Sequence, residues 1–156
     1  MKSMINNPRQ SLPYHLRGAF RGFETALARY LDTVDLPLSH FYILRLQWDG
    51  HGSTQASLAR NSFMTESAAS QVIKQMVKSG LLERSVDETD RRKRLVVLTE
   101  KGKTLREEVV SYGLHISAEH APVISKKDFK KTIEVLQQIH QAFDLFNAKT
   151  SKKSNK

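Results

Sequence analysis

The chain has 156 residues, of which 39% are hydrophobic, and this length suits one domain with a sizeable core. Its formal net charge is +9 at pH 7, which favours a polyanionic partner, although charge alone leaves a generally basic surface as the alternative. The sequence contains no cysteine, which excludes disulfides, thiolate metal sites and thiol redox switches.

The sequence shows no sign of membrane insertion or export. No apolar run approaches the roughly 18 residues of a membrane span. Residues 1–10 lack the apolar core of a signal peptide. We therefore expect a cytoplasmic protein.

The first two predicted helices span residues 12–34 and 39–48. Pro13 lies in the first turn, where proline is tolerated, and Ser39 is the candidate cap of the second helix. Apolar side chains recur at helical spacing in the first helix: Leu16, Phe20, Phe23, Leu27, Tyr30, Leu31 and Val34. The glycine-rich segment 49–53 then predicts a turn.

Two short helices are predicted after this turn. Thr54 or Ser53 caps the first, which ends near residue 61. Thr65 caps the second, which ends at Gly80. Beside the basic hairpin that follows, this small helical unit favours duplex DNA as a partner.

The second of these helices has one apolar and one polar face. The apolar stripe consists of Ala69, Val72, Ile73 and Met76. On the other side Ser67, Gln71, Lys74 and Lys78 recur at i, i+4, i+7 and i+11, with Ser70 beside them. An amide can bond adenine, a hydroxyl several bases, and lysine guanine or phosphate. An ordinary solvated face is the alternative for this helix alone, but its two neighbouring elements favour a DNA-reading helix.

A strongly basic hairpin follows. Residues 81–86 and 95–99 predict two strands, joined by a loop that reads Asp87-Glu88-Thr89-Asp90-Arg91-Arg92-Lys93-Arg94. Four consecutive cations repel one another, and arginine is favoured in narrow minor grooves. We interpret the two aspartates as organisers that accept hydrogen bonds from turn amides or pair with an arginine. A tip that is mobile when free is compatible with ordering on DNA.

Two more helices complete the chain. Thr99 caps one that ends before Pro122, and Ser125 with Asp128 resembles a capping box for the last, which runs to about residue 148. That helix carries a nearly heptad apolar stripe: Phe129, Leu136, Ile139, Phe143 and Phe146. The stripe predicts a dimer interface, with an intrachain core as the alternative. The polar, basic segment 149–156 predicts a disordered tail.

The order of these motifs resembles the MarR family of bacterial transcription regulators. The resemblance lies in Ser53-Thr54-Gln55-Ala56-Ser57-Leu58-Ala59, Lys78-Ser79-Gly80-Leu81-Leu82-Glu83-Arg84, Asp90-Arg91-Arg92 and Leu98-Thr99-Glu100-Lys101-Gly102. It implies a mainly α fold with a small β hairpin. Residues 49–99 would form a winged helix-turn-helix, and residues 12–48 and 100–148 a helical dimerisation region. It also implies that Arg92 is the wing-tip arginine of the minor groove and that a homodimer binds a palindromic operator.

The resemblance and the residue chemistry together predict two sets of contacts. For duplex DNA we expect Ser53, Thr54, Gln55, Thr65, Ser67, Ser70, Gln71, Lys74, Lys78, Arg91, Arg92, Lys93 and Arg94. Members of the family often bind small aromatic or phenolic anions between the dimer helices and the DNA lobe. For such an effector we expect an apolar wall with one or two cations, formed by Tyr14, His15, Arg17, Phe20, His40, Phe41 and Trp48.

The leading prediction is a homodimeric repressor that a small aromatic or phenolic ligand releases from DNA. The alternative is a constitutive, ligand-independent DNA-binding protein of the same fold. An enzyme is a third class, but the sequence has no glycine-rich phosphate loop, nucleophile elbow or triad. His115 and His120 are five residues apart, which is not the spacing of a helical metal pair, so we expect neither a metal site nor a cofactor.

Overall fold

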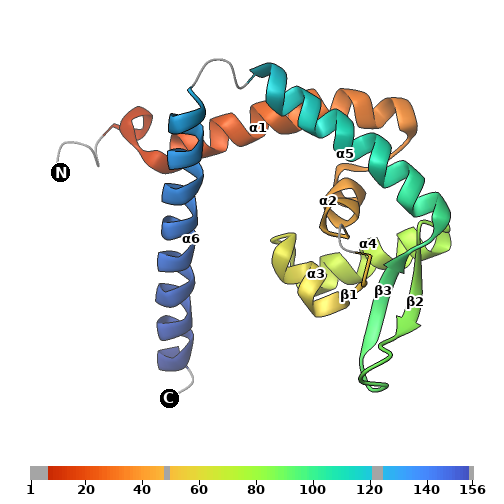
Figure 1. Cartoon of the computed structure of the whole chain (residues 1–156). Helices are drawn as coiled ribbons and strands as arrows, with labels where there is room; N and C mark the ends of the chain where they lie inside the picture. Colours follow the sequence, from red (N-terminus) through yellow and green to blue (C-terminus); the bar gives the residue numbers. More distant parts are fainter. Residues whose placement is uncertain (1–6, 48–49, 121–124, 155–156) are drawn as a thin grey trace. The chain divides into compact units, whose positions relative to one another are not determined.

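The computed structural model describes residues 7–47, 50–120 and 125–154 (Figure 1). The chain divides into two compact units, residues 1–116 and residues 117–156, and each is described by itself. Among the described residues, no helix is both long and apolar enough to cross a membrane.

The N-terminal helices follow the predicted pattern with shifted ends. A 3-10 turn η2 (Pro8–Gln10) precedes α1 (Leu12–Leu31), and the predicted last turn of α1 is instead a 3-10 helix η3 (Asp32–Val34). The next helix, α2 (Leu38–Leu46), has Pro37 at its N-cap position and no side-chain cap. The predicted cap at Ser39 is therefore wrong, because the fixed φ of proline lets the helix begin directly after it.

A helix-turn-helix follows. It consists of α3 (Gln55–Asn61) and α4 (Glu66–Lys78). The Thr54 and Thr65 hydroxyl oxygens each accept a backbone N–H three residues on, both at 3.2 Å. The predicted cap at Thr65 is thus confirmed, and Thr54 rather than Ser53 caps α3. As predicted, α4 stops at Gly80, whose φ of 72° lies in the left-handed region that favours glycine.

The wing is a hairpin that belongs to a three-stranded antiparallel sheet. Strands β2 (Leu82–Val86) and β3 (Arg94–Leu98) form the predicted hairpin. The two-residue strand β1 (Ser53–Thr54) pairs with the other edge of β3, in the order β1-β3-β2. Strand β1 was not expected, because two residues are too few to display an alternating pattern.

Residues 99–102, which follow β3, attach the start of the next helix, α5 (Glu100–His120), to the end of α4 through hydrogen bonds. Thr99 caps α5 through a bond from the Gly102 N–H (3.1 Å), and its own hydroxyl donates to the Gly80 carbonyl (2.6 Å). The Lys101 ammonium donates to the Ser79 carbonyl at 3.0 Å. A Cβ at Gly102 would overlap the Leu81 carbonyl oxygen. The start of α5 therefore packs backbone to backbone against the turn after α4.

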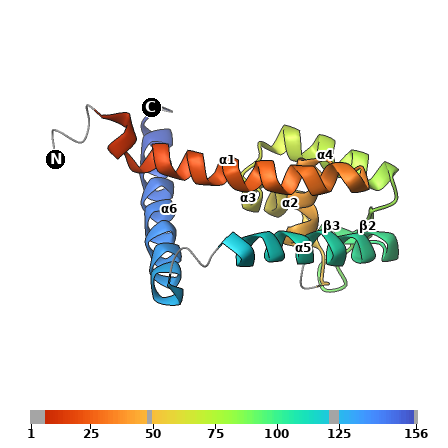
Figure 2. The same cartoon turned by 90° about the horizontal axis from the view of Figure 1, so that it is seen from above.

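The core of the first unit joins the helices to the sheet. Its most deeply buried side chains are Leu27, Leu31, Phe41, Ile43, Leu44, Leu58, Ile73, Met76, Leu82, Val96 and Val109. In Figure 1, α2 lies between the pair α1 and α5 and the pair α3 and α4. Figure 2 shows α1 and α5 running side by side. The Tyr30 hydroxyl donates to Glu108 at 2.7 Å and its ring stacks on Tyr112, so α1 is fixed to α5.

The second unit contains α6 (Lys126–Ser154). Ser125 caps it by accepting the Asp128 N–H at 3.1 Å, as predicted, and donates its own hydroxyl to the Asp128 carboxylate. Helix α6 includes residues 149–154, which belong to the segment for which the sequence predicts a disordered tail. Pro122 and residues 155–156 lie outside the described residues.

Candidate nucleic-acid interface

The polar face of α4 is exposed, as its sequence pattern predicts. Ser67, Gln71, Lys74 and Lys78 are exposed, and Ser70 is half-buried beside them. The opposite face packs into the core through Ala69, Val72, Ile73 and Met76. Because that face is buried, the polar side chains have a fixed direction. They present hydroxyl, amide and ammonium groups, which suit base edges and phosphates.

The residues just before α3 and α4 pair in a strand or cap a helix. Ser53 and Thr54 are paired in β1, and both are half-buried, as is Gln55. Thr54 and Thr65 use their hydroxyl oxygens as helix caps. Each of those hydroxyls still has a proton to donate, and a phosphate oxygen can accept it.

Hydrogen bonds made by Asp87 close the wing tip. The Asp87 backbone N–H donates to the Lys93 carbonyl at 3.2 Å. Its carboxylate accepts the Thr89 hydroxyl (2.6 Å), the Thr89 N–H (2.8 Å) and the Asp90 N–H (3.0 Å). These bonds, the one from the Thr89 hydroxyl most of all, hold the pKa of Asp87 below its usual range. Asp87 therefore organises the loop as an anion.

Asp90 orients the arginine at the tip. One oxygen of its carboxylate accepts the Arg92 backbone N–H at 3.1 Å and the Arg92 Nε at 3.3 Å. The Arg92 side chain is nevertheless 93% exposed, so its guanidinium remains available to a partner. The interpretation of the two aspartates as organisers is confirmed. Arg91, Lys93 and Arg94 are exposed as well.

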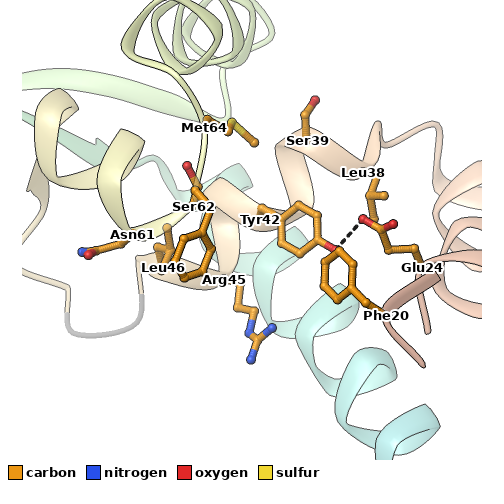
Figure 3. Close-up of a pocket in the computed structure, with 11 residues that line it drawn as sticks. Phe20, Glu24, Leu38, Ser39, Tyr42, Arg45, Leu46, Asn61, Ser62 and Met64 are labelled. Atoms are coloured by element: carbon orange, nitrogen blue, oxygen red, sulfur yellow. Dashed lines mark hydrogen bonds between the residues drawn. The ribbon is translucent and has the colours of Figure 1, made fainter. Parts of the chain in front are cut away.

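A second feature of the first unit is a cavity of about 820 Å³ between α1, α2 and the turn of the helix-turn-helix (Figure 3). Its walls are Phe20, Glu24, Leu38, Ser39, Tyr42, Arg45, Leu46, Asn61, Ser62, Phe63 and Met64. The Phe20 and Tyr42 rings stack at 6.4 Å with an angle of 18°. The lining is mostly apolar, with a few polar groups around it, which is the usual composition of a small-molecule site.

The polar groups of this cavity differ in their availability. The Tyr42 hydroxyl donates to Glu24 at 3.0 Å. Burial, followed by this hydrogen bond, raises the pKa of Tyr42 well above its usual range, so the hydroxyl stays protonated. Arg45 is exposed, and no ion pair holds it within the described part of the chain. The cavity therefore has a carboxylate engaged by a tyrosine and a guanidinium that can receive an anion.

Of the effector residues expected from sequence, only Phe20 lines this cavity. His40 and Phe41 point into the core, where His40 is 8% exposed and Phe41 2%. His15 bonds the Arg9 carbonyl at the start of α1, and its ring meets that of Tyr14 edge to face. Arg17 is an exposed residue of α1 that does not line the cavity, and Trp48 lies outside the described residues.

The residues expected at an effector site therefore do not gather at this cavity. Residues adjacent in sequence point to different sides of α2, and periodicity alone does not say which side faces a void. The residues missed were Glu24, Tyr42, Arg45 and Phe63. Tyr42 and Arg45 are three residues apart, a spacing that places them on one face of α2 and was the available signal.

The comparisons with known proteins agree with this geometry. The sequence profile of the MarR family matches residues 34–93, which contain α2, the helix-turn-helix and the wing tip. A MarR family transcriptional regulator from Silicibacter pomeroyi is 29% identical, with a TM-score of 0.80 over 89% of this chain and 95% of that chain. Residues 34–93 thus match the MarR family. This match and the fold are those of a DNA-binding transcription regulator of the MarR type.

Two further solved structures share this fold. CouR from Rhodococcus jostii RHA1, bound to p-coumaroyl-CoA, is 20% identical, with a TM-score of 0.79 over 86% of this chain and 94% of that chain. BpsR from Bordetella bronchiseptica, whose DNA binding is regulated by 6-hydroxynicotinic acid, is 22% identical, with a TM-score of 0.71 over 83% and 93%. No curated protein sequence matches the chain.

Proposed function

We propose that this protein is a homodimeric repressor that binds a palindromic operator and leaves it when a small aromatic or phenolic ligand binds. The observation that carries the proposal is the pairing, within one unit, of an exposed polar face on α4 with an exposed, carboxylate-organised basic wing. A helix in the major groove and an arginine in the adjacent minor groove together read more of a duplex than either element alone.

The predicted DNA contacts divide by chemistry. Gln71 reads a base edge, because an amide both donates and accepts. Lys74 and Lys78 hold phosphate, as do the hydroxyls of the two capping threonines. Arg92 enters the minor groove, and the other wing cations attract the backbone.

The apolar surface left exposed by the chain supports a dimer. On α6, Phe129 is 50% exposed, Phe143 62% and Leu145 64%. No described side chain of α6 is buried. A helix with so much exposed aromatic surface needs a partner, and a second copy also supplies the second recognition helix that a palindrome requires.

The cavity beside α2 supports the ligand. An aromatic ring fits against Phe20 and Tyr42, a carboxylate fits Arg45, and a ring hydroxyl can donate to Glu24. The CouR complex with p-coumaroyl-CoA and the regulation of BpsR by 6-hydroxynicotinic acid favour this chemical class.

Binding to operator DNA over a range of salt concentrations tests the proposal. The operator is first selected from random duplexes with the full-length protein. With about 6 to 10 phosphate contacts, the slope of log affinity against log salt should lie between about −5 and −9. A slope near zero would refute the DNA-contact surface. Operator binding that no aromatic acid weakens would instead favour a constitutive regulator of the same fold.

A further inference from the structure

Two buried polar side chains lie at opposite ends of α2. Among the described residues, His40 and Gln47 are the polar residues buried in the core, and Gln47 is 4% exposed. The Gln47 Nε2 donates to the Val96 carbonyl at 3.1 Å. The His40 Nε2 and the Gln75 Oε1 lie 3.4 Å apart. Because Val96 belongs to β3 and Gln75 to α4, α2 and its C-cap are hydrogen-bonded to both DNA-reading elements.

The bond from Gln47 meets β3 at the base of the wing. Val96 is the middle residue of β3 and pairs with Ser53 of β1 and Arg84 of β2. The chain after α2 also approaches this point closely, since a Cβ at Gly52 would lie 3.1 Å from the Val96 carbonyl oxygen. The Val96 carbonyl is therefore where the end of α2 is attached to the wing.

Packing alone does not require an amide at this position. An apolar side chain of similar length would fill the same space and would avoid the cost of removing an amide from water. Hydrophobic contact has no preferred direction, whereas a hydrogen bond weakens steeply as its geometry bends. The bond from Gln47 therefore fixes the orientation of β3 relative to α2 more closely than apolar packing would.

A change in that orientation has its largest effect at the wing tip. Strand β1 pairs with β3 only at Leu95 and Val96, so beyond them the wing consists of β2 and β3 alone. Arg92 is four residues before Val96, which is at most about 13 Å of extended chain. A small rotation of β3 at its base thus displaces Arg92 by more than it displaces Val96, and binding contacts must be held within about 0.5 Å.

We propose that Gln47 is a positioning residue for DNA binding, which places the wing-tip Arg92 at a fixed distance from the reading helix α4. Helix α2 packs against α4, so the bond to Val96 orients the wing relative to α4 as well. The inference rests on the proposed contact between the wing and DNA. It adds the residue that determines where the wing lies when that contact forms.

A set of variants of the full-length protein separates positioning from stability. Gln47→Met keeps the approximate length of the side chain and removes the donor, and Gln47→Asn keeps an amide that is too short to reach Val96. Ile43→Val is the matched control in the same helix, because it removes one buried methyl group and leaves both hydrogen bonds of α2. Unfolding in urea establishes that each variant folds and how far its midpoint falls.

Fluorescence anisotropy with the selected operator then measures affinity. Both Gln47 variants should bind operator about two- to tenfold more weakly, because the wing must be ordered on binding. Ile43→Val should stay within about twofold of wild type. In an Arg92→Ala protein, Gln47→Met should change the affinity by less than about twofold, whereas in a Lys74→Ala protein it should keep its full effect.

Distances between spin labels report the wing position without DNA. The sequence has no cysteine, so Ser67→Cys in α4 and Glu88→Cys in the wing, both exposed positions, can be labelled selectively. Mixing with excess unlabelled protein isolates the distance within one chain. Gln47→Met should shift or broaden the distribution of this distance, whereas Ile43→Val should leave it unchanged.

Three results would overturn the inference. If Gln47→Met binds operator as the wild type does, or loses as much affinity in the Arg92→Ala protein, Gln47 does not act through the wing, although the proposed regulator would stand. An unchanged distance distribution would show that the bond contributes stability alone. If Arg92→Ala itself binds operator as tightly as wild type, the proposed wing contact fails, and the inference fails with it.

Discussion

Asp90→Ala at the wing tip should weaken operator binding, although it removes a negative charge from a surface that meets phosphate. Asp90 accepts two bonds from Arg92, one from the backbone N–H and one from Nε. Charge alone predicts tighter binding for the alanine variant, because a carboxylate repels the DNA backbone. Preorganisation predicts weaker binding, because the freed arginine must be ordered when it enters the groove. The sign of the change distinguishes the two effects.

The size of the change follows from the structure. Immobilising a side chain with many rotamers costs about 0.5–1.5 kcal/mol, which corresponds to a two- to tenfold loss of affinity for each wing. The Arg92 side chain is 93% exposed and that of Asp90 30% exposed, so the ion pair adds well under about 1 kcal/mol to folding. The melting temperature of the variant should therefore stay within about 2 °C of the wild-type value.

A double-mutant cycle with Arg92→Ala completes the test. Arg92→Ala alone should lose about 1–3 kcal/mol of operator binding without unfolding the protein. If Asp90 acts through Arg92, then Asp90→Ala should change the affinity of the Arg92→Ala protein hardly at all. Fluorescence anisotropy with labelled operator at one fixed salt concentration measures all four corners of the cycle. Additive losses, or tighter binding by Asp90→Ala, would refute the preorganisation argument.

Gln71→Ala should remove about 1–3 kcal/mol of discrimination at one or two base pairs. Lys74→Ala should instead weaken binding to all duplexes alike and reduce the salt slope by about one. Equal losses of affinity on every sequence for both variants would contradict the assignment of Gln71 to a base and Lys74 to phosphate. Gly102→Ala should lower the free energy of unfolding by more than about 2 kcal/mol in urea, because its Cβ would overlap the Leu81 carbonyl; an unchanged midpoint would show that the contact adjusts easily. Phe143→Glu should convert the dimer to a monomer in light scattering and abolish operator binding. Gln138→Glu adds the same charge on the opposite face of α6 and should change neither the oligomeric state nor operator binding. If the Phe143→Glu protein is still a dimer, the apolar stripe of α6 does not form the interface.

Features that depend on a few consecutive residues could be predicted from sequence. The caps at Thr54 and Thr65 and the stop at Gly80 are local hydrogen-bond patterns. The two faces of α4 follow from helical periodicity, since each residue turns the side-chain direction by a fixed angle. The mixed charge of the wing tip indicated that aspartates would order the arginines, because both partners lie within one turn.

Features that depend on distant segments were decided only by the tertiary structure. Strand β1 forms because Ser53 and Thr54 pair with the edge of β3. The two residues themselves carry no sequence pattern that predicts this pairing. The cavity takes its walls from α1, α2 and the α3–α4 turn. Sequence periodicity could not show that His40 and Phe41, both expected at an effector site, pack into the core instead. Phe63 is unremarkable in the sequence, where it reads as an apolar residue in a turn. Its left-handed backbone and its place on the cavity wall arise because the helix end and the core fix the turn from both sides.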